Sequence, residues 1–233
     1  MRWGTAIIIG LLAGFACSTA NAAQLVVVEA RGIGLRPGTL LDPGKTLVLK
    51  PGQHVTLISD SGATLSLDGP YNKAPAIAQG QGVTLAATLK GLATEQNARL
   101  TEVGTTRGAT PAPPLPQAWV IDATRNGSVC LLEGHAPVFW RPLDTKTSDL
   151  VIMPADRSWK AQANWPAGMD QIAPPQLVAV HGDAAYFVSL GGVESAISVN
   201  TVPAALANDD MRAAWMARKG CDRQAEALLR TRQ

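Results

Sequence analysis

The chain has 233 residues, with 20 Lys and Arg against 18 Asp and Glu, so its formal net charge is only +2. A charge this close to zero does not provide the basic surface that nucleic-acid binding requires, and we expect no nucleic-acid partner. The sequence contains 16 prolines and 22 glycines, while charged residues make up only 16%. This composition favours a turn-rich β-protein of one or two domains over a helical bundle.

The first 22 residues have the three parts of a secretory signal peptide. Arg2 supplies a positive charge, residues 6–16 form a short apolar run, and small residues precede a cleavage point after Ala22. The run is shorter than the roughly 20 residues that span a bilayer. We therefore expect a signal peptide over residues 1–22, a periplasmic location and no membrane span after cleavage. Cys17 leaves open an alternative, a lipoprotein anchored at that cysteine.

Cleavage after Ala22 would leave two cysteines, Cys130 and Cys221. An even pair in an oxidising compartment predicts a disulfide bond. Neither cysteine has the C-x-x-C or Cys–His spacing that is typical of a metal site or a catalytic thiol. The bond would connect the C-terminal tail to the middle of the chain.

Residues 23–103 predict a small β-domain that ends in a helix. Four short runs rich in β-branched or alternating residues are each followed by a turn signal, a pattern typical of a meander, a small barrel or a roll. These runs are residues 25–28, 46–49, 54–58 and 63–67. Leucines at helical spacing predict an amphipathic helix over residues 83–103. Residues 104–117 are rich in proline and small residues, which predicts a linker between two domains.

Residues 118–203 predict a second β-domain. Seven or eight short strands at regular spacing favour an immunoglobulin-like sandwich. The predicted strands are 118–121, 128–132, 137–141, 149–153, 159–164, 176–180, 185–190 and 196–202. Four tryptophans fall within this region, and they suit either core packing or a stacking platform for carbohydrate. They are Trp119, Trp140, Trp159 and Trp165.

Residues 204–233 predict a helical hairpin at the C-terminus. We expect one helix over Ala204–Arg218, a stop at Gly220 and a second short helix that begins at Cys221. Trp215 and the disulfide would dock this hairpin on the sandwich. The predicted fold class is therefore mainly β with helical additions.

No motif for catalysis or for binding a metal or cofactor has the required spacing. Residues 38–46 resemble a phosphate loop, but five residues rather than four separate the two glycines, and a turn is the better interpretation. Residues 32–38 fail as a dinucleotide fingerprint for a similar reason. The histidines His54, His135 and His181 are isolated, and turn chemistry accounts for Asp144, Asp149, Asp156 and Asp183. We predict no catalytic, metal-binding or cofactor-binding residue, and no cofactor.

One stretch carries a family resemblance. Residues 34–38, 47–52, 55–62 and 65–70 repeat a pattern of short strand and glycine turn that resembles FecR-like periplasmic domains. The resemblance covers about a fifth of the chain and implies a small β-roll, with no activity attached. FecR-type transducers join this domain to a membrane span, whereas we expect a cleavable signal and no span here. We therefore do not expect a direct role in signalling to a sigma factor.

The leading hypothesis is a non-enzymatic periplasmic binding or scaffold protein of the bacterial envelope, with an envelope protein or glycan as its partner. Exposed strand edges would provide the contact surfaces. The alternative is an envelope carbohydrate-active hydrolase whose site is assembled from distant residues, based on the tryptophans and scattered acids. A purely structural role in an envelope assembly is a third hypothesis.

Overall fold

The computed structural model describes residues 24–75, 113–174 and 180–231. Within these ranges the chain forms fourteen strands and two C-terminal helices, which confirms the predicted mainly-β class with a helical hairpin. The predicted signal peptide, the helix over residues 83–103, most of the linker and most of the strand over 176–180 lie outside the described residues. The division into two domains stays a prediction.

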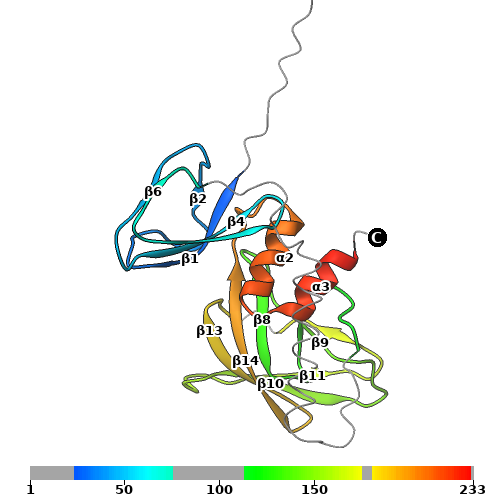
Figure 1. The fold of residues 1–233 in the computed structure, drawn as a ribbon. Helices are drawn as coiled ribbons and strands as arrows, with labels where there is room; N and C mark the ends of the chain where they lie inside the picture. Colours follow the sequence, from blue (N-terminus) through cyan, green and yellow to red (C-terminus); the bar gives the residue numbers. More distant parts are fainter. Residues whose placement is uncertain (1–23, 76–112, 175–179, 232–233) are drawn as a thin grey trace, which may run out of the picture.

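The N-terminal part is a four-stranded antiparallel sheet with a two-stranded ribbon beside it (Figure 1). The sheet has the order β2-β1-β4-β5, and β3 pairs with β6 in the ribbon. The bounds are β1 Leu25–Arg31, β2 Leu40–Leu41, β3 Leu47–Leu49, β4 His54–Ser59, β5 Thr64–Asp68 and β6 Tyr71–Lys73. The sequence pattern did not predict β2 and β6, because two or three residues are too few to show alternation.

The strand β1 is buried on both faces, which explains why its sequence does not alternate. Leu25 and Val27 pack into one cluster with β4 and the ribbon, while Val26 and Val28 pack into a second cluster with the C-terminal helices. A β-bulge between Val27 and Glu29 shifts the register against β4. The N-terminal sheet therefore shares a hydrophobic core with the C-terminal part of the chain.

The C-terminal part contains a five-stranded sheet of order β11-β10-β13-β14-β8 and a three-stranded sheet of order β12-β9-β7. Its strands are β7 Val120–Asp122, β8 Gly127–Leu132, β9 Val138–Trp140, β10 Ser148–Pro154, β11 Ala161–Trp165, β12 Gln171–Ile172, β13 Ala184–Leu190 and β14 Val193–Val202. The pairs β8–β14 and β7–β9 are parallel, and the other pairs are antiparallel. Immunoglobulin domains are built from antiparallel sheets, and the two parallel pairs depart from that pattern. The immunoglobulin-like connectivity therefore stays a prediction.

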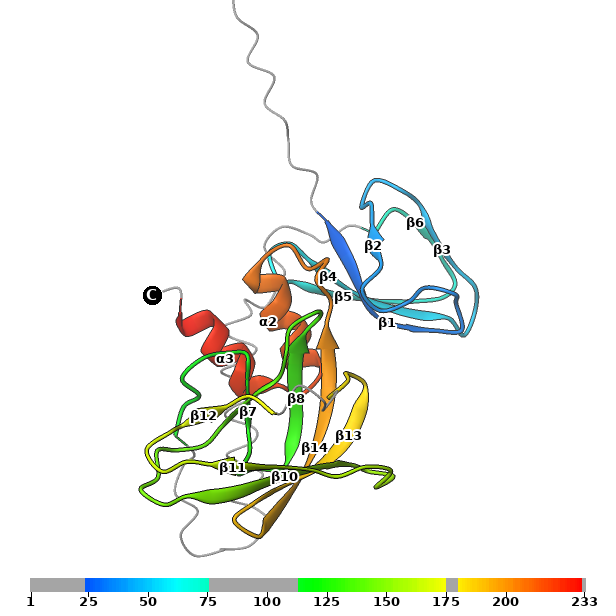
Figure 2. The same ribbon diagram turned by 180° about the vertical axis from the view of Figure 1, so that it is seen from behind.

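One apolar cluster joins these two sheets into a sandwich. Ile121 and Phe139 from the smaller sheet pack against Leu150, Val188 and other residues of the larger sheet. Core packing accounts for the four tryptophans: Trp140 and Trp165 are buried, while Trp119 and Trp159 are partly buried against the clusters. In Figure 2, β7 and β12 lie between α3 and the strand β11.

The chain ends in the helices α2 Asp209–Arg218 and α3 Asp222–Arg230. The predicted first helix began at Ala204, but the structure begins it at Asp209, because the Asn208 side chain caps the helix by accepting the Met211 N–H at 2.9 Å. Gly220, at φ +76°, separates the helices as predicted. The indole N–H of Trp215 donates to the Thr201 carbonyl at 3.0 Å and holds α2 on β14. No helix within the described ranges is long and apolar enough to cross a membrane.

Candidate binding site

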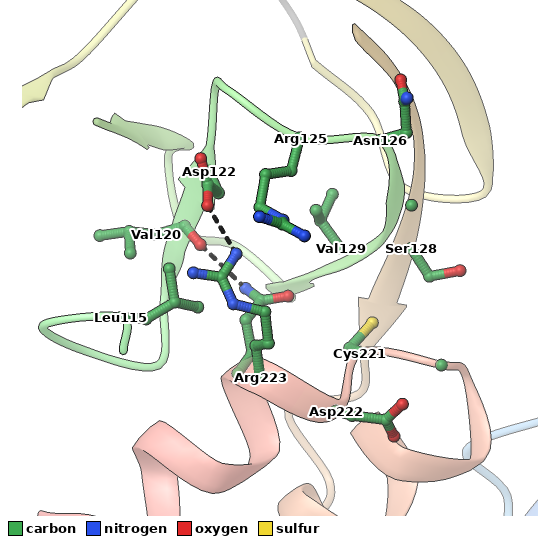
Figure 3. A pocket seen from close by; sticks show the side chains of 13 residues that line it. Leu115, Val120, Asp122, Arg125, Asn126, Ser128, Val129, Cys221, Asp222 and Arg223 are labelled. Carbon is green, nitrogen blue, oxygen red and sulfur yellow. Dashed lines mark hydrogen bonds and ion pairs between the residues drawn. The ribbon is translucent and has the colours of Figure 1, made fainter. Parts of the chain in front are cut away.

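A half-open cavity of about 600 Å³ lies between the β7–β8 turn and the start of α3 (Figure 3). Thirteen residues line it: Leu115, Val120, Asp122, residues 125–129 and residues 220–224. A volume of this size falls within the range of pockets that bind small ligands. Its walls come from segments about a hundred residues apart in the sequence, so the cavity exists only in the folded chain.

The disulfide between Cys130 and Cys221 lies at one side of the cavity, where β8 meets the start of α3. The two sulfurs are bonded, with the Cα atoms 6.0 Å apart, and both cysteines are buried. The bond confirms the predicted pairing and is consistent with an oxidising compartment. It links β8 to the first residue before α3 and so holds the two walls of the cavity together.

The buried amide of Gln224 adds a second connection at the same place. Its Nε2 donates to the carbonyls of Ala118, Val120 and Cys130 at 2.9, 3.2 and 2.8 Å, and its Oε1 accepts the Cys130 N–H at 2.6 Å. One side chain of α3 therefore satisfies backbone groups of both β7 and β8. Buried backbone groups are costly to leave unpaired, so this contact stabilises the wall.

The polar wall of the cavity is organised by the ion pair of Asp122 and Arg223. Arg223 Nη1 lies 2.5 Å from Asp122 Oδ2, and Arg223 Nη2 donates to the Pro113 carbonyl at 2.8 Å. The other carboxylate oxygen, Oδ1, accepts the Thr124 N–H at 2.9 Å and the Thr124 hydroxyl at 2.6 Å. Both oxygens of this buried carboxylate are therefore engaged.

Arg125 is the second cation of the cavity, and no acid in the described part of the chain matches its charge. Among residues 24–75, 113–174 and 180–231, no Asp or Glu forms an ion pair with its guanidinium. Figure 3 shows this guanidinium directed into the cavity, on the side of Asp122 and Arg223. The chain in this region is exposed, so the side chain can meet a solute.

Asp222 is the second acid of the cavity lining, and it differs from Asp122. Desolvation by burial, with a further contribution from the nearby Glu226, raises the pKa of Asp222 above 3.8. Its Oδ1 is buried without a hydrogen-bond partner in the described part of the chain. In Figure 3 this carboxylate points away from the Asp122–Arg223 pair, so the two acids do not converge on one point.

The histidines and the turn acids that the sequence singled out do not line the cavity. His54 contacts Asp68 and Thr56 on the N-terminal sheet, and His135 and His181 lie in separate loops of the C-terminal part. Asp144 and Asp156 accept backbone N–H groups two residues on, as predicted for turns. The turn prediction is wrong for Asp149, which lies in β10 opposite Asn164. The Ser158 N–H holds the pKa of Asp156 below its usual value. In the described residues no group of three or more His, Cys, Asp or Glu could hold a metal ion.

The loop that resembles a phosphate site is a turn between β2 and β3. Asp42 Oδ1 accepts the Gly44 N–H at 2.8 Å, and the Lys45 N–H donates to the Asp42 carbonyl at 3.1 Å. The loop therefore uses its N–H groups internally instead of presenting them to a phosphate. This geometry agrees with the predicted turn.

The sequence predicted Cys221 as a disulfide partner but did not single out Asp122, Arg125 or Arg223. Asp122 and Arg223 are 101 positions apart in the sequence, and motif spacing covers only residues that are close in the sequence. It could therefore not predict this contact. Comparisons with protein-family models, with curated proteins and with solved structures found no match. The cavity itself is therefore the basis for assigning a function.

Proposed function

We propose that this protein is a non-enzymatic binding protein of the bacterial envelope and that the cavity beside the disulfide is its binding site. The observation that supports the proposal is a 600 Å³ cavity whose walls are held by a disulfide, a buried amide and an ion pair. Binding is stronger when the site does not have to be ordered first. A preformed cavity whose two lining acids, Asp122 and Asp222, point in different directions suits binding better than hydrolysis.

The periplasm is the proposed compartment. The buried Cys130–Cys221 bond supports an oxidising space, and the expected signal peptide supports export. The FecR-like resemblance of the N-terminal segment belongs to the same proposal and rests on the sequence pattern of residues 34–70. An envelope protein or glycan is the proposed partner.

A matched pair of tryptophan variants tests this function. Ser128 lines the cavity, so Ser128→Trp would fill it, whereas Ser66 lies exposed on β5 and Ser66→Trp leaves it open. We expect immobilised wild type and Ser66→Trp to retain the same component of an envelope extract, and Ser128→Trp to lose it. Mass spectrometry and glycan analysis identify the retained component, and thermal melting verifies that both variants fold. Equal retention by both variants, or none above an empty matrix, contradicts the proposal.

A carbohydrate-active hydrolase is the second candidate, and one observation favours it. The cavity is lined by two acids in different states: Asp122 is paired with Arg223, while burial raises the pKa of Asp222. Glycosidases use such a contrast between a base or nucleophile and an acid. Because Asp222 points away from Asp122 in Figure 3, the two carboxylates would first have to turn toward one bond. The hypothesis predicts release of reducing ends from envelope glycan, lost in Asp222→Asn. An unchanged glycan after prolonged incubation with wild type would eliminate it.

A further inference from the structure

We infer that the cavity binds a small carboxylate with an apolar body and that Arg125 is the residue that binds the carboxylate group. The inference rests on the proposed binding function and names the class of ligand for the same site. It follows from the charges around the cavity, from the apolar surface beneath them and from the volume available.

The charges favour an anion. Asp122 and Arg223 neutralise each other at 2.5 Å, and the Thr124 groups occupy the remaining oxygen of Asp122. Asp122 is thus not free to bind a cationic ligand. Asp222 points away from this cluster in Figure 3, which leaves Arg125 as the cavity cation that has no paired acid among the residues that the structure describes. A guanidinium binds a carboxylate through two parallel hydrogen bonds, which a neutral amide cannot reproduce.

The surface beside the cation favours an apolar body. Leu115, Val120 and Val129 are buried residues that line the cavity. Apolar walls with a few placed polar groups are the usual composition of a small-ligand pocket. A ligand of matching shape would place its carboxylate at Arg125 and its hydrocarbon part against these residues. Both a free organic acid and the C-terminal end of a peptide have this chemistry.

N-acetyl-leucine and its neutral analogue N-acetyl-leucinamide test the inference on the mature chain. Backbone chemical shifts in ¹H–¹⁵N spectra report where each probe binds and how tightly. We expect shifts at residues 125–129 and 220–224, with the amide binding at least ~10-fold more weakly than the acid. Arg125→Gln should weaken binding of the acid about as much, while Arg125→Lys should restore part of it because the charge remains.

Arg36→Gln is the matched control, because Arg36 is exposed in the N-terminal part and does not line the cavity. It should bind the acid as wild type does. A peptide that ends in leucine, Ac-Ala-Ala-Leu, distinguishes the two sources: tighter binding than N-acetyl-leucine indicates a chain end, and equal binding indicates a free acid.

Two outcomes overturn the inference. Equal binding of acid and amide in the cavity, unaffected by Arg125→Gln, refutes the carboxylate preference and leaves the proposed function intact. Absence of shifts in the cavity with either probe also refutes it, and the Ser128→Trp capture experiment then decides the proposed function separately.

Discussion

At the scale of single residues, Gln224 is the most connected side chain of the candidate site. It is 3% exposed and forms four hydrogen bonds to the backbone of β7, β8 and the residue Ala118. Because glutamine is usually found at the surface, its helix position alone predicts a solvated side chain. Only the packing of α3 against the gap between β7 and β8 buries it.

Gln224→Leu keeps the volume of this side chain and removes all four bonds. We expect a loss of about 3–5 kcal/mol in the free energy of unfolding, since one N–H and three carbonyls lose the bonds that Gln224 makes with them. Urea denaturation followed by tryptophan fluorescence measures the loss. The exposed Gln162 on β11 provides the control, and Gln162→Leu should change stability by less than ~0.5 kcal/mol. Similar values for the two variants would show that the buried bonds contribute little.

Asp222 makes stability depend on pH. Because burial raises the folded-state pKa of this carboxyl above 3.8, the folded chain holds the proton more tightly than the unfolded chain. The resulting stabilisation is fully present below the unfolded pKa and is lost as pH rises through the folded pKa. Asp222→Asn cannot ionise, so its stability relative to wild type should increase from pH 4 to pH 7.

Urea midpoints at intervals across that range test this prediction. Glu226→Gln should change the pH dependence in the same direction but less, because Glu226 is the smaller cause of the raised pKa. A difference between wild type and Asp222→Asn that stays constant with pH would contradict the assignment.

At the scale of elements, the turn after β5 packs closely against the backbone that follows β3. Gly69 follows β5, and a Cβ atom on it would lie 1.8 Å from the Lys50 carbonyl oxygen. The sequence marks this position as a turn, yet only the approach of the chain after β3 explains why no side chain fits there.

Gly69→Ala should therefore destabilise the fold by at least ~2 kcal/mol, because the added methyl group collides with backbone and not with a movable side chain. Gly34→Ala is the control: its added Cβ would meet nothing within 4 Å, and the position has no positive φ. Thermal unfolding monitored by circular dichroism compares the two variants. Two variants with the same melting temperature would refute this explanation of Gly69.

At the scale of the whole molecule, the disulfide restricts the unfolded chain as much as it supports the cavity. Cys130 and Cys221 are separated by 91 positions and lie in the core that packs the helices against both β-parts. In the chain-entropy account, closing a loop of this length contributes about 4–5 kcal/mol. The double variant Cys130→Ala, Cys221→Ala should lose roughly that amount.

Denaturant titration of the double variant against the oxidised wild type measures the contribution. Intact mass with and without reductant verifies the bond in the isolated protein. Since both cysteines are buried, we expect reduction only when denaturant is present. Ready reduction of the folded chain, or a double variant as stable as wild type, would contradict this role.

The local features of this protein follow from short stretches of its sequence. The turn signals and short β-rich runs predicted most longer strands, from Leu25–Arg31 to Val193–Val202, and the two late cysteines predicted their own pairing. These signals are local because alternation, turn residues and caps act within a few residues of each other.

The tertiary structure alone decided the parallel pairing of β8 with β14, the burial of Gln224 and the meeting of Asp122 with Arg223. Several strands carry similar apolar patterns, so the pattern does not say which strand pairs with which. The entropy of closing a loop changes slowly with its length, so the sequence distance between two strands does not decide their pairing either. Packing of all the strands and helices together makes that selection. The cavity forms where the β7–β8 region meets the start of α3. Because these segments are distant in the sequence, no sequence motif predicts it.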